Sequence, residues 1–405
     1  MPRLLLEGVR VLDLTSVVFG PYASQILGDY GADVIKIESP EGDSTRSTGP
    51  ATEPGMSAIF LGANRNKRSI VLDLKRPEAR EALLALVDGA DVFMHSIRPQ
   101  KLPALGLDPQ SLMARNARLV YAGLHGFGQD GPYGGKPAYD DIIQGLAGLA
   151  ALTERQSGEP RYLPTIAADK TCGLVAAHAI LAALFARERT GHGSFVEVPM
   201  FESLVSFVLV EHYYGRHFEP GLAPPGYPRV LAPWRRPYRT VDGYVCMLPY
   251  TDAHWHRFFT EVGRPELAAD ARFADIAART RNIEALYVLA GEFIAGRSTA
   301  AWLEACERLD IPAAPMHRLE DLERDPHLVA TGFFRSLGDP AADAVRFPGA
   351  GVRVDGRPLE LNMPPRLGQH TREVLREAGL PDARIESLAG GGTRGATRPL
   401  KEMAP

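Results

Sequence analysis

The chain has 405 residues, of which 45% are hydrophobic, and its formal net charge is −4 at pH 7. This is the composition of an ordinary globular protein, and the lack of a basic field argues against nucleic acid as a partner. The length predicts two or three domains. Cys172, Cys246 and Cys306 form no CxxC pair and have no histidine at metal-ligand spacing, so we expect no disulfide framework, no zinc or other metal site, and a cytoplasmic location.

The N-terminus and the apolar segments predict neither a signal peptide nor a membrane span. Only three apolar residues stand together before Glu7, too few for a signal-peptide core. The longest apolar candidate, residues 172–186, is interrupted by Gly173 and His178 and is shorter than the ~18 residues that a span needs. We therefore expect no membrane partner.

The first part of the chain alternates strand and helix patterns. Strands are predicted over residues 8–15, 32–39, 68–75, 91–97 and 118–128. Helices are predicted over residues 20–31 and 77–90, the second with Pro77 in its first turn. Alternation at this spacing predicts a parallel sheet covered by helices. No GxGxxG turn follows the first strand, so a dinucleotide cofactor is not expected.

The rest of the chain is predominantly helical by pattern. Helices are predicted over residues 142–152, 170–189 and 200–218, and a Pro/Gly-rich connector over 219–240. A strand at 242–249, helices from 252 to about 309, an extended piece at 311–317 and a helix–turn–helix pattern at 318–334 follow. The final elements are a strand pattern at 345–356, a helix at 370–380 and a Gly/Arg-rich tail that we expect to be disordered.

One acid, Asp169, stands at the start of the apolar helical pattern over residues 170–189. The favoured interpretation is a helix N-cap, worth about 0.5–2 kcal/mol, with Thr165 as a rival cap. The functional alternative is a carboxylate that helix N–H groups keep ionised and that attacks a thioester to form a mixed anhydride. The small neighbours Ala167, Ala168 and Gly173 fit either a large substrate or close helix packing.

A glycine-rich segment, residues 125–141, runs from His125 to two adjacent acids. Such composition is usual for a surface loop. It also follows an apolar strand, at the place where open α/β sheets bind ligands. Asp140 could therefore cap the next helix or act as a second acid in a site.

Two groups of basic residues have a similar ambiguity. Cations surround the strand at 68–75 and follow the strand at 91–97, namely Arg65, Lys67, Arg68, Lys75, Arg98 and Lys101. They form either a solvated face or phosphate contacts for an anionic carrier. Arg235, Arg236 and Arg239 stand beside Trp234 and could bind a carboxylate or be exposed loop residues.

Taken together and in this order, several segments resemble the class III CoA-transferases (CaiB/BaiF), the family of formyl-CoA transferase and carnitine CoA-transferase. The resemblance runs from about Leu6 to Leu380, through residues 8–38, 66–75, 126–140, the Asp169 segment, 311–328 and 367–380. It implies an α/β fold with a Rossmann-like large domain and a smaller α+β domain. It also implies a ring-shaped chain that interlocks with a second copy in a homodimer, with the active site where domains and subunits meet.

The resemblance also divides the chain into parts. Residues 1–200 are expected to form the large Rossmann-like, CoA-binding domain, which includes the Asp169 segment. A linker over 201–240 and a small domain over 241–325 follow. Residues 326–385 are expected to return to the large domain, and 386–405 to form the disordered tail.

The resemblance assigns functional residues by position. It implies that Asp169 attacks the donor acyl-CoA, passes through an aspartyl anhydride and an aspartyl-CoA thioester, and delivers CoA to an acceptor carboxylic acid. Tyr139 and Asp140 are expected beside Asp169. The expected CoA contacts are Val18, Leu72, Lys75, Ser96, Arg98 and Lys101, and the candidate substrate contacts are His125, Arg235 and Arg236. Coenzyme A is then a substrate, and no permanently bound cofactor is expected.

Two departures from the family pattern matter. Formyl-CoA enzymes have glutamine where this chain has Val18, which favours a longer or less polar acyl group. Their four-glycine lid is absent, and its nearest counterpart is residues 224–229.

Racemases of the same superfamily use a histidine in a "GHD" motif, where this chain has Tyr139. Tyrosine, with an ordinary pKa near 10, is a poor base at neutral pH, so transfer is favoured. His125 keeps an acyl-CoA racemase as an alternative, and a catalytically silent CoA-binding protein is the third.

Overall fold

The computed structural model describes residues 4–390 and divides into two compact units. Unit 1 contains the chain up to Ala147, Pro164–Val205 and the chain from Gly332; unit 2 contains Gly148–Leu163 and Ser206–Thr331. The expected large domain included residues 148–163, which the structure places in unit 2. The reason is local: Arg155 on helix α7 (Leu149–Ser157) donates to the Pro225 carbonyl, and Gln156 donates to the Val230 carbonyl.

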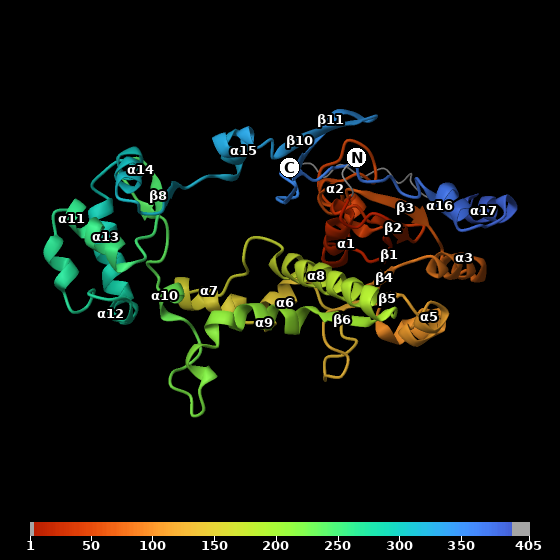
Figure 1. The fold of residues 1–405 in the computed structure, drawn as a ribbon, viewed down its shortest axis with the longest axis horizontal. Coiled ribbons are helices and arrows are strands. Elements are labelled where there is room, and N and C mark those ends of the chain that lie inside the picture. Colours follow the sequence, from red (N-terminus) through yellow and green to blue (C-terminus); the bar gives the residue numbers. More distant parts are fainter. Residues whose placement is uncertain (1–3, 391–405) are drawn as a thin grey trace, which may run out of the picture. The chain divides into compact units, whose positions relative to one another are not determined.

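Unit 1 is built on a six-stranded parallel sheet in the order β3-β2-β1-β4-β5-β6 (Figure 1). The strands are β1 (Arg10–Leu14), β2 (Asp33–Glu38), β3 (Lys67–Val71), β4 (Val92–His95), β5 (Val120–His125) and β6 (Phe195–Pro199). The first five match predicted strands, whereas β6 lies in a segment for which no strand was predicted. The order reverses between β1 and β4, as in a Rossmann-like fold.

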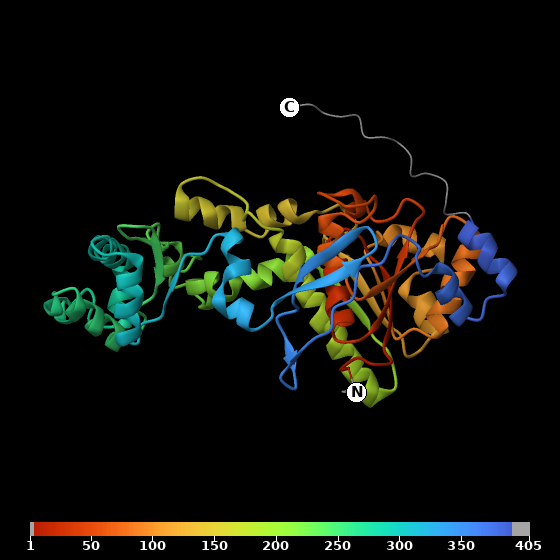
Figure 2. The same ribbon diagram turned by 90° about the horizontal axis from the view of Figure 1, so that it is seen from above.

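Helices cover both faces of this sheet (Figure 2). Helices α1 (Phe19–Asp29) and α8 (Ala167–Thr190) lie together on one face. The other face is covered by α3 (Pro77–Asp88), α5 (Pro109–Arg115), α16 (Thr371–Glu377) and α17 (Asp382–Ala389). A buried core of strand residues such as Leu12, Ile35 and Phe93 and helix residues such as Leu83 and Val374 joins this second layer to the sheet.

Close packing of α1 on α8 depends on a glycine. A Cβ atom at Gly173 would lie 3.0 Å from both the Phe19 carbonyl oxygen and the Tyr22 ring. Of the two alternatives for the small residues near Asp169, Gly173 therefore fits close helix packing.

Within residues 4–390, α8 is the one helix long and apolar enough to cross a membrane by length and composition. The candidate recognised in the sequence, residues 172–186, was too short for a span, but the helix extends beyond it at both ends, and its most apolar window has a mean hydropathy of 1.4 in spite of His178. Half of its most apolar window is buried inside the protein, where Cys172, Ala176 and Ile180 pack. The apolar character of α8 is thus partly explained by its place in the core.

The short elements of unit 1 complete its loops. They are α2 (Ala58–Ala63), α4 (Leu102–Leu105) and α6 (Asp140–Leu146), with the hairpins β10 (Phe334–Asp339)–β11 (Ala342–Pro348) and β12 (Arg353–Val354)–β13 (Arg357–Pro358). The predicted helix at 142–152 is divided into α6 and α7, because Gly148 adopts a left-handed conformation with φ 89°. Helix α17 runs to Ala389, into the segment expected to be a disordered tail, and residues 391–405 lie outside the described chain.

Unit 2 has a three-stranded antiparallel sheet, β7 (Tyr238–Arg239), β8 (Tyr244–Met247) and β9 (Ala313–Pro315). Its helices are α7, α10 (Pro228–Leu231), α11 (Asp252–Glu261), α12 (Ile276–Arg281), α13 (Ile283–Ile294), α14 (Thr299–Arg308) and α15 (Pro326–Ala330), and α9 (Met200–His212) contains the boundary between the units. The core is aromatic, with Trp255, Phe258, Phe259, Tyr287 and Trp302 buried together.

Candidate active site

A pocket of about 220 Å³ opens at the carboxyl ends of the parallel strands of unit 1. Its walls come from the loops after β1, β4 and β5 and from the first residue after β6. We call it the switch-point pocket; it is lined by Ser16, Val17, Phe19, Ser96, Arg98, Pro99, residues 124–127, Gln129, residues 135–139, Asp169 and Met200. Ligands of open α/β sheets bind at this reversal of strand order, so the fold itself marks this pocket as the candidate site.

Asp169 lies in the first turn of α8 and lines the pocket, with only 7% of its surface exposed. The N-cap interpretation of Asp169 is wrong, because Ile166 occupies the N-cap position of α8. The apolar side chain of Ile166 makes no capping hydrogen bond. Thr165 does not cap it either, since its hydroxyl accepts a hydrogen bond from Lys170. The carboxylate of Asp169 is thus free of the structural role that the sequence favoured.

Asp140 supplies the missing cap from another helix. One of its carboxylate oxygens accepts the backbone N–H of Asp169 at 3.0 Å, and the other accepts the side-chain amide of Gln144 at 2.6 Å. Asp140 is the first residue of α6 but makes no cap bond to α6 itself. It therefore fixes the start of α8, and with it the position of Asp169.

The pKa of Asp169 is raised to about 6: burial raises it most and the nearby charge of Asp140 adds to the rise, whereas the backbone N–H of Phe19 lowers it. Phe19 is the first residue of α1, so the Asp169 carboxylate faces the positive end of a helix other than its own. A group with this pKa is mostly ionised at pH 7. It can act as a nucleophile and still carries the energetic cost of a buried charge.

Cationic and neutral polar groups share the pocket with Asp169. The exposed side chains of Arg98 and Lys136 line it. His125, at the end of β5, also lines it, and its ring lies 5.4 Å from that of His95. Burial lowers the pKa of His125 to about 4, so its imidazole is neutral at physiological pH.

Comparison with known proteins decides the family. The model of CoA-transferase family III matches residues 6–371. The chain belongs to CoA-transferase family III. The enzyme class predicted from the sequence, an acyl-CoA:carboxylate CoA-transferase, is confirmed.

Several relatives of this transferase are similar over almost their full lengths. Succinate–glutarate CoA-transferase of Agrobacterium fabrum is 34% identical, over 92% of this chain and 95% of its own. Succinyl-CoA:mesaconate CoA-transferase of Haloarcula hispanica is 33% identical, over 94% and 99%. The probable fatty acyl-CoA transferase Rv3272 of Mycobacterium tuberculosis is 31% identical, over 92% and 98%.

Solved structures of the family share the fold of this transferase. An aspartate-to-alanine mutant of Rv3272 matches with a TM-score of 0.80 at 30% identity, over 91% of this chain and 98% of its own. A CaiB/BaiF family protein from Brucella suis matches with a TM-score of 0.75 at 33% identity, over 92% and 99%. The predicted Rossmann-like α/β fold is thereby confirmed.

The structure of the transferase brings five of the predicted site residues together. Tyr139, Ser96, Arg98 and His125 line the switch-point pocket with Asp169, and Tyr139 is 68% exposed there. Asp140 lies directly behind Asp169 through the hydrogen bond described above.

The other predicted residues lie elsewhere. Val18 is buried between Val17 and Phe19, which line the pocket, whereas Val18 itself does not. Lys101 ends the short 3-10 turn after β4, outside the lining. Leu72 lines a smaller hollow with Pro40 and Asp73, and Lys75 is exposed three residues further on.

Arg235 and Arg236 lie in unit 2, where both are exposed. Arg236 covers the ring of Trp234 at 4.6 Å. Among residues 4–390, no cluster of three or more His, Cys, Asp or Glu side chains could hold a metal ion.

The pocket also contains groups that the sequence did not single out. Lys136 lies inside the glycine-rich segment of residues 125–141, and a lysine between glycine and proline in such a loop is a signal that the sequence analysis did not use. Val17 and the backbone N–H of Phe19 had no comparable signal, because neither a backbone conformation nor a backbone donor can be recognised from the residue type.

Proposed function

We propose that Asp169 is the covalent nucleophile of CoA transfer. Its carboxylate oxygen attacks the thioester carbonyl carbon of the donor acyl-CoA, forming a C–O bond while the C–S bond breaks and CoA leaves as the thiolate. The thiolate then attacks the aspartyl carbonyl of this anhydride, which gives the aspartyl-CoA thioester and releases the donor acid as its carboxylate.

The second half repeats these steps with the acceptor. The acceptor carboxylate attacks the aspartyl thioester and expels the CoA thiolate, giving a new anhydride. The thiolate then attacks the acceptor acyl carbon, forms the product thioester and restores the Asp169 carboxylate. Each step exchanges one activated acyl bond for another, so no ATP is consumed.

The observation that carries this proposal is a buried carboxylate that lines the pocket and has no ion-pair partner among residues 4–390. Structural buried acids are neutralised by cations, whereas burial and a second acid raise the pKa of Asp169 to about 6. Partial desolvation also makes a carboxylate more reactive toward a carbonyl carbon.

We further propose that Arg98 and Lys136 bind anionic parts of CoA or of the acids, since both cations line the pocket. Val18, Leu72, Lys75, Ser96 and Lys101 stay predicted CoA contacts, Tyr139 and Asp140 predicted partners of Asp169, and His125 a predicted substrate contact. CoA is a substrate in this scheme. We also propose a cytoplasmic location, which is consistent with three free cysteine thiols.

For substrate class we propose a dicarboxylic acyl donor or acceptor of four or five carbons. The names of two relatives, succinate–glutarate and succinyl-CoA:mesaconate CoA-transferases, favour this class. Arg235 and Arg236 offer exposed guanidinium groups for a distal carboxylate.

Substitution of each arginine by alanine should raise KM for dicarboxylates about 10-fold or more and leave KM for monocarboxylates nearly unchanged, as expected for loss of a charged hydrogen bond. Arg272→Ala is the matched control, because Arg272 is an exposed arginine of unit 2 that pairs with Asp270. Equal increases for both acid classes would remove the assignment.

We also propose that two ring-shaped chains interlock into a homodimer. Large apolar side chains on α8 and α9 support an interface there: Leu174, Phe185, Phe207 and Val210 are 53–75% exposed. Light scattering coupled to gel filtration should give twice the 44.0 kDa chain mass. A monomer at micromolar concentration would contradict this assembly.

The nucleophile is tested by Asp169→Asn and Asp169→Ala, with Asp141→Asn, an exposed acid on α6, as the matched control. Both Asp169 variants should lose about 10³-fold or more of the transfer rate, because a covalent step is removed. Wild-type enzyme incubated with acyl-CoA alone should form a thioester that hydroxylamine converts to an aspartyl hydroxamate, visible by mass spectrometry at residue 169.

The alternatives give different results in the same samples. Solvent deuterium at Cα of the acyl-CoA without an acceptor acid would indicate a racemase. Tight CoA binding with no trappable thioester and no turnover would indicate a silent binding protein. An Asp169→Ala enzyme with normal turnover would refute the nucleophile.

A further inference from the structure

The loop between β1 and α1, residues 15–18, is held in an unusual conformation at the edge of the switch-point pocket. Val17 lines the pocket and has φ 71°, in the left-handed region that β-branched residues rarely adopt. Two residues later, Phe19 lines the same pocket as Asp169, and its backbone N–H lowers the pKa of the Asp169 carboxyl. The conformation of this loop therefore sets one wall of the pocket and one donor to the proposed nucleophile.

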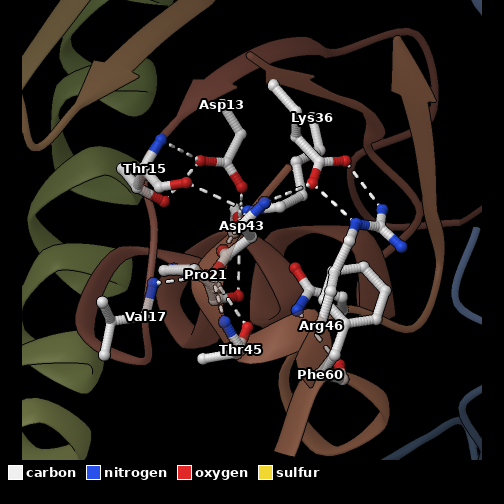
Figure 3. A network of polar contacts seen from close by, with 12 residues as sticks. Asp13, Thr15, Val17, Pro21, Lys36, Asp43, Thr45, Arg46 and Phe60 are labelled. Carbon is white, nitrogen blue, oxygen red and sulfur yellow. Dashed lines mark hydrogen bonds and ion pairs between the residues drawn. The ribbon is translucent and has the colours of Figure 1, made fainter. Parts of the chain in front are cut away.

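A fully buried ion pair contacts this loop (Figure 3). The Lys36 ammonium donates to the Thr15 carbonyl at 3.0 Å and to Asp43 at 2.9 Å. The other carboxylate oxygen of Asp43 accepts the backbone N–H of Val17 at 3.3 Å. The side chains of Lys36 and Asp43 are 0% and 1% exposed. The pair thus holds the loop on both sides of Ser16.

A second buried pair fixes the two ends of the same loop. Asp13 accepts the backbone N–H of Thr15 at 2.9 Å, as well as the hydroxyl groups of Thr15 and of Ser24 on α1. Lys67 donates to Asp13 at 3.3 Å and to the Pro21 carbonyl, in the first turn of α1, at 2.9 Å. These contacts hold the end of β1 and the start of α1, and the strained residue Val17 lies between them.

We propose that Lys36 and Asp43 are positioning residues of the transferase: they hold Val17 in its strained conformation and so aim the Phe19 N–H at the Asp169 carboxylate. Neither side chain lines the pocket, so neither contacts the substrate. The inference rests on the proposed function of Asp169. It assigns a catalytic purpose to a charged network that the reaction itself does not use.

Stability alone is a weak explanation for this network. A buried ion pair is often no more stabilising than apolar residues of the same volume, because both charges must be taken out of water. The same unit contains a buried pair without a pocket role: Arg65 and Asp29, at the far end of α1, with side chains 8% and 5% exposed. That pair serves as the reference for any effect of burial alone.

The test compares Asp43→Ala, Asp43→Asn and Lys36→Met with Asp29→Asn. In Asp43→Ala the Val17 N–H loses its acceptor and the loop relaxes. The Phe19 donor then moves away from Asp169, and kcat should fall about 10- to 100-fold, as expected for misplacement of a reacting group by about 1 Å.

The acid limb of the pH–kcat profile is the second readout. Loss of the Phe19 donor should move this limb to higher pH, since that donor favours the ionised carboxylate. Asp140 from α6 also raises the pKa of Asp169; the other titratable or charged groups near it are Cys172 on α8 and Arg98, Lys136 and His125, which line the same pocket.

Asp43→Asn keeps an oxygen that can accept the Val17 N–H, so it should recover part of the lost rate. Lys36→Met removes the contact to Thr15 and the ion pair with Asp43, but it leaves the Asp43 oxygen that accepts the Val17 N–H, and it should shift both readouts in the same direction. It remains informative if Asp43→Ala does not fold. Asp29→Asn should lower the melting temperature and leave the acid limb in place.

Wild-type kcat and an unmoved acid limb in folded Asp43→Ala or Lys36→Met would overturn the inference. An equal shift of the limb in Asp29→Asn would overturn it as well. Full activity of Asp169→Asn would instead refute the proposed function. A failure of the positioning inference and a failure of the proposed function are therefore distinguished by different variants.

Discussion

Two groups of buried acids lie in unit 1, and they are treated in opposite ways. Asp13 and Asp43 are paired with Lys67 and Lys36, and although burial tends to raise their pKa values, these cations lower them. Asp169 is paired with no cation among residues 4–390, and burial beside Asp140 raises its pKa to about 6. The protein neutralises buried charge where the charge holds a loop and leaves it uncompensated where chemistry is proposed.

The difference shows what a raised pKa costs and provides. An ionised Asp169 destabilises the fold, because its charge is better solvated in the unfolded chain. The same desolvation leaves an oxygen nucleophile that needs no base to activate it at neutral pH. Perturbed groups of this kind cluster at functional sites for that reason.

The largest expected effect comes from breaking the compensated group. Asp13→Asn leaves Lys67 buried without its carboxylate, and removing one partner of a buried pair costs about 3–5 kcal/mol. Burial already lowers the pKa of Lys67 to about 8 in spite of Asp13. We therefore expect a large fall in the free energy of unfolding, measured by urea titration at pH 7.

Asp88→Asn is the control for this prediction, since the Asp88–Arg115 pair is 50% and 42% exposed and should contribute less than about 1 kcal/mol. If the two variants lost equal free energy of unfolding, the buried Asp13–Lys67 pair would contribute no more to stability than an exposed ion pair.

A smaller effect of opposite sign is expected at the uncompensated acid. The pKa of an aspartate is near 3.9 in the unfolded chain and about 6 for Asp169 in the fold, so the folded state binds the proton more tightly. The stability contributed by this group is present at low pH and is lost as the pH rises through about 6. Asp169→Asn removes the charge and should raise the free energy of unfolding by about 1–3 kcal/mol at pH 8.

The pH dependence of this gain is its control. At pH 4 the wild-type carboxyl is protonated in the fold, and the difference between the two proteins should nearly vanish. A variant that is less stable than the wild type at pH 8 would show that Asp169 is a structural acid after all.

The contrast between the two groups also marks the limit of sequence reasoning. Apolar runs predicted five of the six strands of the sheet, because an apolar run is a local signal. Strand β6 was missed because Phe195–Pro199 is short, contains Glu197 and continues directly into α9. Asp169 was recognised as a candidate, but the capping of α8 was assigned to Asp169 itself. The residue that caps the start of α8 is Asp140, and sequence reasoning could not find it because the contact spans 29 positions.

The compensated network had a signal that was not used. Lys36 stands at the centre of the apolar strand β2, and a lysine within a strand buried on both faces requires a buried anion. Its partner Asp43 lies seven residues later, in a loop. Sequence could therefore indicate that a buried pair exists, whereas the strained Val17 that the pair holds is visible only in three dimensions.

The smallest expected effect concerns the acid behind Asp169. Asp140→Asn removes a negative charge that raises the Asp169 pKa but keeps an oxygen that accepts the Asp169 N–H. The start of α8 should stay in place, and the acid limb of the pH–kcat profile, which should lie near pH 6 in the wild type, should move to lower pH by about 1 unit or less. Asp141→Asn, one residue along α6 and exposed, should leave the limb unchanged. A limb that moved to higher pH in Asp140→Asn would mean that Asp140 stabilises the Asp169 charge through position rather than opposing it through repulsion, and the two acids would then function as one coupled unit.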